Sequence, residues 1–318
     1  MKRAASYPAQ TYDDPNDVRF VRIVRPADAS QKDAVNIIGV PFDGGVLGRR
    51  GAAGGPPAIR EAMSGFSNYN VELGESLEGS RVFDLGDLLV DQEDVLKAHP
   101  QIEAEMAKCL AGNSLLVVLG GDNSLSLPCI RASGAKFGKL GLIVIDSHFD
   151  LRGRIGGKPT SGSSYGLAIE TMRELDPRRV VEVGVHGFLN SKDYFEKAKK
   201  LGIKVVTASE ARSKGPREVA KEAYEAASDG ADAVYLSVDL DAVDLSYVSG
   251  VSAPSAGGIP ADYLLDLLYE LGKMPGVRCA DLVELAPSLD PTGKSARVAA
   301  SALVYLIAGF NSRRKARH

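Results

Sequence analysis

The stretch Leu142–Asp150, LIVIDSHFD, determines the predicted fold class because an apolar run changes abruptly into chemically active side chains. Consecutive apolar residues without alternation predict a strand that is covered on both faces, as in parallel sheets. Asp146, His148 and Asp150 follow directly and would share one face in extended backbone. Because ligands bind outside the carboxyl ends of strands in open α/β sheets, this stretch predicts a parallel sheet with a site at its edge.

Similar apolar runs lie on both sides of this stretch, and helical patterns alternate with them. The predicted strands are Val35–Val40, Ser114–Leu119, Leu142–Asp146, Val180–Val185, Lys204–Thr207, Ala233–Asp239 and Val277–Leu285. Helical spacing links Leu264, Leu267, Leu268 and Leu271, and also Tyr194, Ala198 and Leu201. This alternation predicts one α/β domain over residues 1–318, with helices on both faces of the sheet and residues 1–33 as an N-terminal extension. We expect Gly44–Pro57 and Leu151–Ser164 to be long, functional loops.

The composition is typical of a globular protein with no general affinity for polyanions. The chain has 38 basic and 41 acidic side chains, a net charge of −3, which gives no overall attraction to nucleic acid or anionic membranes. No apolar run reaches the ~18 residues of a membrane span, and no signal peptide is evident. Cys109, Cys129 and Cys279 show no CxxC spacing and are expected to be buried thiols. We expect a cytoplasmic protein whose basic run Arg313–Arg317 is a solvated tail.

Polar residues, mostly acids, follow four of the predicted strands. GGDNS occupies Gly120–Ser124, DSHFD occupies Asp146–Asp150, DLDAVD occupies Asp239–Asp244, and Glu284 stands near the end of the last strand. Carboxylates gathered in a dry site would repel each other strongly unless cations lay among them. Two divalent ions would balance four carboxylates, and oxygen ligands with one imidazole favour Mn²⁺ over structural zinc. Two such ions can share a water molecule and lower its pKa.

These motifs also have simpler interpretations. Paired aspartates often cap helices or face solvent. GGDNS alone could be a phosphate-binding turn, although it lacks the lysine of a P-loop and the spacing of GxGxxG. The two aspartate motifs at the ends of separate predicted strands together favour a metal site. We interpret His99, His186 and His318 as structural or incidental residues.

The three motifs in this order resemble the signatures of the ureohydrolase family, which includes arginase, agmatinase and formimidoylglutamase. The resemblance rests on Gly120–Ser124, Asp146–Asp150 and Ser237–Asp244 and extends from about Asn36 to the last helix. It implies a three-layer α/β/α fold with a largely parallel, roughly eight-stranded sheet, and an assembly into homotrimers or homohexamers. It also implies a centre of two Mn²⁺ ions, with the ligands Asn123, Asp146, His148, Asp150, Asp239 and Asp241.

Three positions depart from the pattern of the family. Asn123 stands where His is usual, and because an amide oxygen is the weaker donor, one ion is expected to bind weakly. The formimidoylglutamase branch includes members with this variant. Tyr165 replaces the His that is often assigned to proton transfer in arginases, and Leu245 replaces the proline that usually follows Asp244.

The substrate residues implied by the resemblance are Arg152, Ser161, Ser163 and Glu284. Glu284 matches the glutamate that binds the cationic amidine or guanidine group. Arg152 and the SGS segment resemble the formimidoylglutamase branch, and a guanidinium can pair bidentately with the carboxylate of an acidic substrate. Arg152 would repel the cationic tail of agmatine. The alternative is that Arg152 forms an ion pair with a ligand aspartate.

These expectations combine into one hypothesis with two alternatives. The hypothesis is a manganese-dependent hydrolase that converts N-formimidoyl-L-glutamate to L-glutamate and formamide, a step of histidine degradation. Asp150 would transfer a proton to the leaving amine, and Glu284 would orient the amidinium. The first alternative is an agmatinase or guanidino-acid hydrolase that releases urea. The second is a metal-poor pseudoenzyme that acts as a partner in an oligomer.

Overall fold

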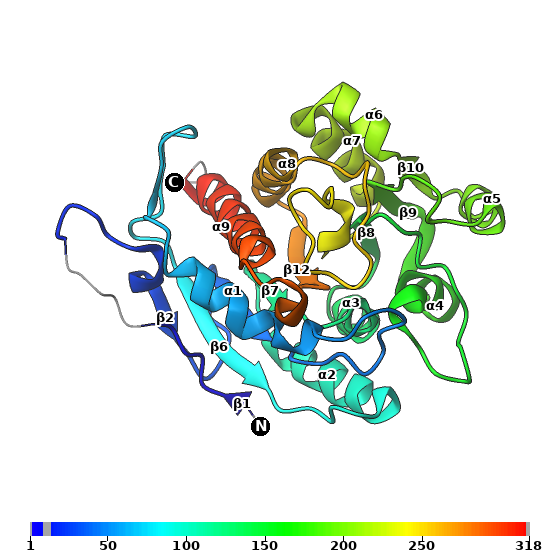
Figure 1. Ribbon diagram of the computed structural model, residues 1–318, viewed down its shortest axis with the longest axis horizontal. Coiled ribbons are helices and arrows are strands. Elements are labelled where there is room, and N and C mark those ends of the chain that lie inside the picture. The colour runs from blue at the N-terminus through cyan, green and yellow to red at the C-terminus, as the bar shows by residue number, and fades with distance from the viewer. Residues whose placement is uncertain (1, 9–13, 316–318) are drawn as a thin grey trace.

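A mainly parallel β-sheet forms the centre of the computed structural model, which describes residues 2–8 and 14–315. Its strands are β1 (Lys2–Arg3), β2 (Val24–Pro26), β3 (Val35–Gly39), β6 (Val82–Leu88), β7 (Leu115–Leu119), β8 (Leu140–Ile145), β9 (Leu175–Val183), β10 (Lys204–Val206), β11 (Ala233–Asp239) and β12 (Val277–Val283). Their order is β1-β6-β3-β7-β12-β11-β8-β9-β10, and β2 pairs with β6 beside this path (Figure 1). The eight strands from β6 to β10 pair in parallel, which confirms the predicted sheet.

The residues expected to form an N-terminal extension contribute strands to this same sheet. Strand β1 pairs antiparallel with β6, and β2 pairs parallel with β6. A separate antiparallel pair consists of β4 (Tyr69–Asn70) and β5 (Glu75–Ser76).

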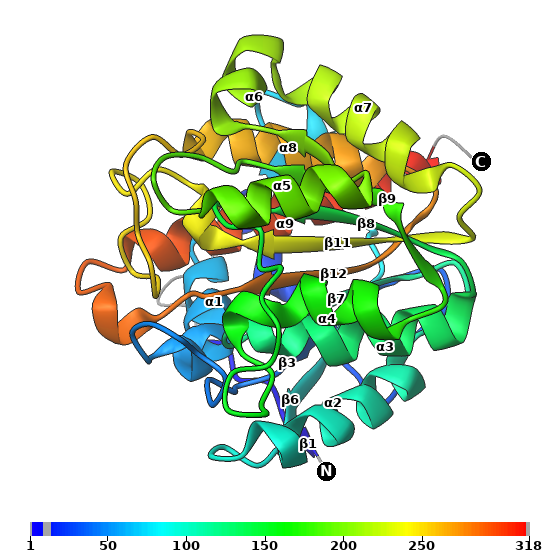
Figure 2. The same ribbon diagram turned by 90° about the vertical axis from the view of Figure 1, so that its right-hand side faces the viewer.

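Helices cover both faces of the sheet, as predicted. One face carries α1 (Gly55–Met63), α6 (Ala208–Lys214), α7 (Pro216–Ser228), α8 (Ala261–Lys273) and α9 (Lys294–Lys315). The other face carries α2 (Val95–Cys109), α3 (Ser126–Phe137), α4 (Ser164–Thr171) and α5 (Lys192–Leu201). Figure 2 shows α7 and α8 on one side of β11 and β12, and α3 and α4 on the other. Short 3-10 helices complete the chain at η1 (Phe20–Arg22), η2 (Ala52–Gly54), η3 (Asn123–Leu125), η4 (Ser161–Ser163), η5 (Leu240–Ala242) and η6 (Pro287–Leu289).

Strand β8 shows why the apolar runs are continuous. Ile143 and Ile145 pack into the core under α7 and α8, whereas Leu142 and Val144 pack into the core under α3 and α4. Successive side chains of a strand point to opposite faces, so a strand between two helical layers needs apolar residues at every position. The four leucines of α8 are likewise buried, and the three cysteines are buried free thiols, as expected.

Strand β6 escaped the sequence analysis because two acids interrupt its apolar pattern. Asp84 is buried in this strand, where the Arg60 guanidinium of α1 binds both of its carboxylate oxygens, at 2.8 and 3.0 Å. The same guanidinium donates to Asp87 at 2.5 Å. Arg60 is only 1% exposed and Asp84 only 2%, so their opposite charges are paired inside the core. Removing one member of such a buried pair would leave an uncompensated charge.

Two further expectations were wrong in part. The stretch Gly44–Pro57 is not loop throughout, since it contains η2 and the start of α1, where Pro56 and Pro57 suit the first helical turn because they need no backbone donor. The basic run is not a solvated tail at Arg313, which lies in α9, is 9% exposed and donates to the carbonyls of Met274 and Val277. Residues 316 and 317 of that run, and His318 after it, lie outside the described residues. No helix within the described residues has the length and apolar character of a bilayer span.

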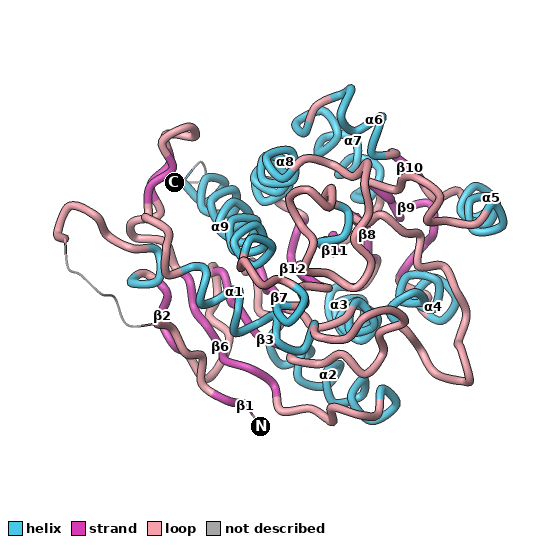
Figure 3. The backbone as a smooth tube through the Cα atoms, in the orientation of Figure 1, coloured by secondary structure: helices cyan, strands magenta, loops and turns pink. Residues whose placement is uncertain are grey.

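The strand order places four strand ends side by side. Strands β7 and β8 follow each other in the chain, but β12 and β11 lie between them in the sheet. Such an interruption of the strand order opens a crevice at the carboxyl edge of an α/β sheet. Figure 3 shows long connections at this edge from β8 to α4 and from β11 to α8, which are loop except for η4 and η5. These loops leave room for a site.

Candidate active site

Four neighbouring strands deliver the residues that the sequence analysis singled out. Asn123 follows β7, Asp146 follows β8, Asp239 ends β11 and Glu284 follows β12. These strands lie in the order β7-β12-β11-β8 and run parallel, so their carboxyl ends meet at the same edge. Residues separated by more than 150 positions in the sequence therefore line one cavity.

The cavity has a volume of about 240 Å³. Its wall consists of Leu47, Gly48, Asn123, His148, Asp150, Arg152, Ser161, Gly162, Asp239, Asp241, Ser252, Ala253 and Glu284. Asp146 is fully buried behind this wall and contacts it through His148. The floor is thus rich in carboxylates, and Arg152 adds positive charge to the wall.

Asp146, His148 and Asp241 form the tightest group of potential metal ligands. One ligand atom from each lies within 4.8 Å of the others. Nδ1 of His148 is 3.1 Å from Oδ2 of Asp241 and 3.4 Å from Oδ1 of Asp146. Ser147 holds Asp241 in place, because its hydroxyl donates to Oδ1 at 2.7 Å. Asp239 is joined to this group by the backbone N–H of Asp241, which donates to Oδ1 of Asp239 at 2.8 Å.

The buried acids around His148 would be stabilised by additional positive charge. Burial, and then the charge of Asp241, raise the pKa of Asp146 and of Asp239 well above the usual range. Burial alone would lower the pKa of His148, but Asp146 and Asp241 outweigh it and raise that pKa to about 12. Oδ2 of Asp146 is buried and has no hydrogen-bond partner among the described residues. A free carboxylate oxygen among crowded acids and one imidazole is a donor set that fits a divalent cation such as Mn²⁺.

Asp150 occupies a strained position at the cavity wall. Its φ angle is +46°, a left-handed conformation that few residues other than glycine adopt. Burial raises the pKa of its carboxyl to about 7, although the nearby charge of His148 opposes this effect. A carboxyl that titrates near neutrality is suited to exchange protons with a substrate.

Asn123 does not have the orientation that a metal ligand needs. Its Oδ1 accepts hydrogen bonds from the hydroxyls of Ser126 at 2.8 Å and Tyr165 at 3.1 Å. Its Nδ2 donates to Oδ2 of Asp150 at 2.6 Å. An amide NH₂ group has no lone pair for a metal, so the side chain presents a donor rather than a ligand to the cavity. Tyr165, which replaces the histidine of arginases, is fully buried in this hydrogen-bond network.

Glu284 has one fixed and one free oxygen. Its backbone is also left-handed, with φ of +69°. Oε1 accepts a hydrogen bond from the backbone N–H of Asn123 at 2.7 Å, whereas Oε2 is buried and has no partner within the described part of the chain. Burial, and then the charge of Asp122, raise the pKa of this carboxyl well above its usual range. A free acceptor at the cavity wall is well suited to bind a cationic N–H group.

The expected substrate residues lie in different environments. Arg152 is exposed at the cavity, and no carboxylate of the described residues lies within 4.0 Å of its guanidinium, so the alternative of an ion pair with a ligand aspartate is not observed. Ser161 lines the cavity and accepts from the backbone N–H of Leu47 at 3.1 Å. Ser163 does not line it: its buried hydroxyl bonds to the backbone of Thr160 and closes a local turn.

Several supporting residues were missed by the sequence analysis. The Asn190 amide binds the Asp146–Asp150 loop twice, since Oδ1 accepts from the N–H of Phe149 at 3.0 Å and Nδ2 donates to the carbonyl of Ser147 at 2.9 Å. Asp281 accepts hydrogen bonds from Tyr235 and Ser237, each at 2.7 Å. Asp281 could have been noticed in the sequence, because it is an acid inside a strand that is expected to be buried. For Asn190, only the folded chain shows the contact.

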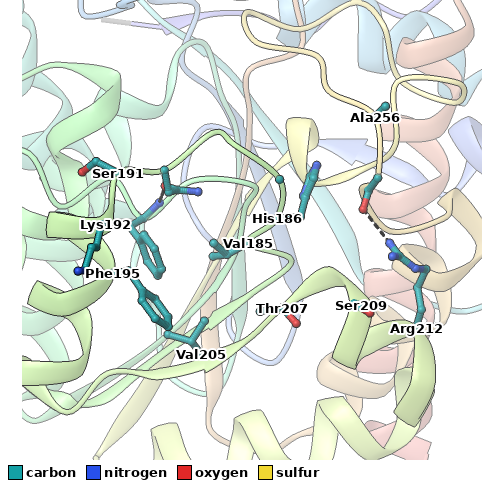
Figure 4. Close-up of a pocket in the computed structure, with 14 residues that line it drawn as sticks. Val185, His186, Ser191, Lys192, Phe195, Val205, Thr207, Ser209, Arg212 and Ala256 are labelled. Atoms are coloured by element: carbon teal, nitrogen blue, oxygen red, sulfur yellow. Dashed lines mark hydrogen bonds between the residues drawn. The ribbon is translucent and has the colours of Figure 1, made fainter.

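A larger cavity lies behind the same loop. It has a volume of about 680 Å³, and Phe149 forms part of its wall, whereas none of the carboxylates described above does so. Figure 4 shows Phe195 and Val205 on one side of this cavity and Arg212 on the opposite side, where Arg212 donates to the carbonyl of Gly257 at 2.7 Å. The loop therefore separates a larger cavity without carboxylates in its lining from the carboxylate-rich one.

Comparison with known proteins agrees with this geometry. The model of the Arginase family matches residues 33–309. The chain belongs to the arginase family. It is 33% identical to a formimidoylglutamase of Halalkalibacterium halodurans over 289 residues, which cover 90% of each protein.

Solved structures of the arginase family extend this comparison. The crystal structure of formimidoylglutamase from Bacillus subtilis superposes with a TM-score of 0.88 at 29% identity, covering 95% of this chain and 94% of the other. Formiminoglutamase of Trypanosoma cruzi with Mn²⁺ superposes with a TM-score of 0.84 at 29% identity, covering 93% and 99%. The chain thus has the arginase-family fold over nearly its whole length.

Proposed function

We propose that this arginase-family chain hydrolyses N-formimidoyl-L-glutamate to L-glutamate and formamide. The observation that carries the proposal is the charge pattern of the cavity: among the described residues, Glu284 has a carboxylate oxygen without a hydrogen-bond partner, and the Arg152 guanidinium forms no salt bridge. A substrate with a cationic amidinium head and carboxylates on its tail complements both groups. Agmatine carries a cation at its tail and would be repelled by Arg152. Two formimidoylglutamases among the similar proteins support the same substrate.

We further propose that the carboxylate cluster holds two Mn²⁺ ions. The residues that would hold them are Asp146, His148, Asp150, Asp239 and Asp241, and the free Oδ2 of Asp146 and the crowded acids support this proposal. The similar structure from T. cruzi contains Mn²⁺. Bound divalent ions would supply Lewis acidity and a water molecule of lowered pKa. With the orientation of Asn123 described above, the two ions would share five of the six expected ligand residues, and one ion would bind more weakly.

The residues of the chain then have distinct roles in the reaction. Glu284 binds the amidinium through Oε2 while Asn123 N–H fixes Oε1, which orients the amidine carbon. Water adds to that carbon, and the bond from the carbon to the glutamate nitrogen breaks. Asp150, which lines the cavity, transfers the proton that this nitrogen needs to leave as an amine. Arg152 holds a carboxylate of the substrate tail.

A substrate panel tests the proposal. The protein, purified without chelator and incubated with Mn²⁺, is offered N-formimidoyl-L-glutamate, agmatine and 4-guanidinobutyrate, and formamide and urea are measured separately. We expect formamide from the first compound and little urea from the others. Urea release at a higher kcat/KM would show a guanidine hydrolase instead. A metal content near zero after incubation, with no turnover, would show a pseudoenzyme.

A further inference from the structure

Arg152 is held by an aromatic ring rather than by an acid. The centre of its guanidinium lies 5.3 Å from the centroid of the Tyr194 ring. A guanidinium at this distance is attracted by the negative face of the ring, and unlike an ion pair this contact leaves the positive charge available to an anion. Arg152 is exposed at the cavity, so a substrate can reach its N–H donors.

The opposite side of the Arg152 side chain is confined as well. A Cβ atom at Gly162 would lie 3.0 Å from Cδ of Arg152 and 2.9 Å from Cδ1 of Leu47. The absence of a side chain at Gly162 therefore makes the space through which Arg152 runs. The backbone of the two residues is also joined, since the N–H of Arg152 donates to the carbonyl of Gly162 at 3.1 Å. Arg152 thus lies between Gly162 and the ring of Tyr194.

Helix α5 supports the loop that carries Arg152. Lys197 of α5 donates to the carbonyl of Leu151 at 2.7 Å, and Asn190, just before α5, holds the same loop at Ser147. Only Ala198 of α5 is buried, so the helix contributes little to the core. Tyr194 is half-buried and packs against the core cluster under α3 and α4, and its ring also contacts the Arg152 guanidinium, while its hydroxyl makes no hydrogen bond with the described residues.

We propose that Tyr194 is a positioning residue for substrate specificity. Its ring holds the Arg152 guanidinium at the cavity, where the guanidinium binds the carboxylate tail of the substrate and excludes cationic tails. The inference rests on the proposed function for the identity of the acidic amidine, and it adds the residue that makes Arg152 effective.

Three variants and one double variant test this role. Tyr194→Phe keeps the ring and is expected to stay within about twofold of the wild type in every constant. Tyr194→Leu is expected to raise KM for N-formimidoyl-L-glutamate about tenfold, with kcat and manganese content changed less than about twofold. KM for N-methylformamidine, which lacks a carboxylate, should not change. In an Arg152→Ala background, Tyr194→Leu should add little further effect, because both changes remove the same interaction.

Binding of L-glutamate separates this inference from the proposed function. Its dissociation constant is measured by calorimetry for the same variants and requires no turnover. If the wild type fails to cleave N-formimidoyl-L-glutamate but binds L-glutamate about tenfold more tightly than Tyr194→Leu, the proposed function fails and the role of Tyr194 stands. Equal binding by both proteins, an equal rise in KM for N-methylformamidine, or full additivity with Arg152→Ala would each overturn the role of Tyr194.

Discussion

Nδ2 of Asn123 donates a hydrogen bond to Oδ2 of Asp150 at 2.6 Å, and this contact decides how the GGDNS segment acts in the site. The amide cannot turn over easily, because its Oδ1 accepts from the hydroxyls of Ser126 and Tyr165. A reversed amide would also place Oδ1 against the carboxylate of Asp150. Asn123 therefore restrains a proposed proton-transfer residue, where a histidine would bind a metal ion directly.

Asn123→His is expected to tighten the binding of one Mn²⁺ ion. Neutral imidazole is a better donor for a first-row divalent ion than a carboxamide, and the gain should be about tenfold in affinity. Occupancy should also become more pH-dependent below about pH 6.5, because the imidazole must lose a proton to bind. Electron paramagnetic resonance of free Mn²⁺ during a titration measures this gain. An unchanged affinity in a folded variant would mean that position 123 does not reach the metal.

Asp146→Ala and Asp239→Ala are each expected to abolish activity and lower the manganese content. Each substitution removes a buried carboxylate, so the remaining ligands would neutralise less of the positive charge of the bound ions. Metal analysis and turnover at saturating Mn²⁺ are the measurements. Asp244→Ala is the matched control from the same motif, since Asp244 accepts from Ser246 and Gly257 and does not line the cavity. Retention of more than about a tenth of the wild-type rate in the first two variants would contradict the binuclear assignment.

Glu284→Gln should retain both metal ions but lose substrate binding and turnover together. The amide oxygen can still accept from the N–H of Asn123, whereas the amide NH₂ group cannot pair with an amidinium. We expect kcat/KM to fall by at least about a hundredfold, as for other lost charge-assisted contacts at a reacting group. Steady-state kinetics and metal content are measured on the same preparation. Loss of manganese in this variant would identify Glu284 as a metal ligand instead.

Glu182→Met is expected to stabilise the protein, more strongly at higher pH. Glu182 is fully buried in β9, and neither of its carboxylate oxygens has a partner among the described residues. Burial, and then the charges of Asp146 and Asp150, raise its pKa well above 4.5. The folded state therefore keeps a proton that the unfolded chain releases, so this group lowers the stability of the wild type as pH rises above about 4.5.

Urea unfolding of chelator-treated protein between pH 5 and pH 8 measures this effect. The gain in unfolding free energy should be about 1–3 kcal/mol near neutral pH and smaller at pH 5. Glu182→Gln is the control that removes the titrating group but keeps a buried polar side chain. Its gain in unfolding free energy over the wild type should also rise with pH, but should be smaller than that of Glu182→Met. A wild type that is more stable than Glu182→Met at pH 8 would indicate a hidden partner for the carboxyl.

The sequence by itself determined the parallel sheet and the edge at which the site lies. Strands β8 and β11 are apolar on both faces because helices cover both, and the acids Asp146 and Asp239 mark the carboxyl ends of these strands. Periodicity and position along one chain carry this information. The motifs that resemble the ureohydrolase signatures added the expected ligand set and Glu284 as the carboxylate expected to bind the cationic group of the substrate.

Only the tertiary structure decided which atoms face the cavity. Hydrogen bonds from the hydroxyls of Ser126 and Tyr165 fix the orientation of the Asn123 amide. The hydroxyl of Ser163 closes a local turn and does not face the cavity. Strand β6 escaped notice because Asp84 is neutralised by Arg60, 24 residues away in the sequence. The guanidinium of Arg152 depends on Tyr194 in the same way. The partners of a polar side chain, and the orientation in which they meet it, come from residues that are distant in the sequence. Residue type alone therefore cannot specify them before the chain has folded.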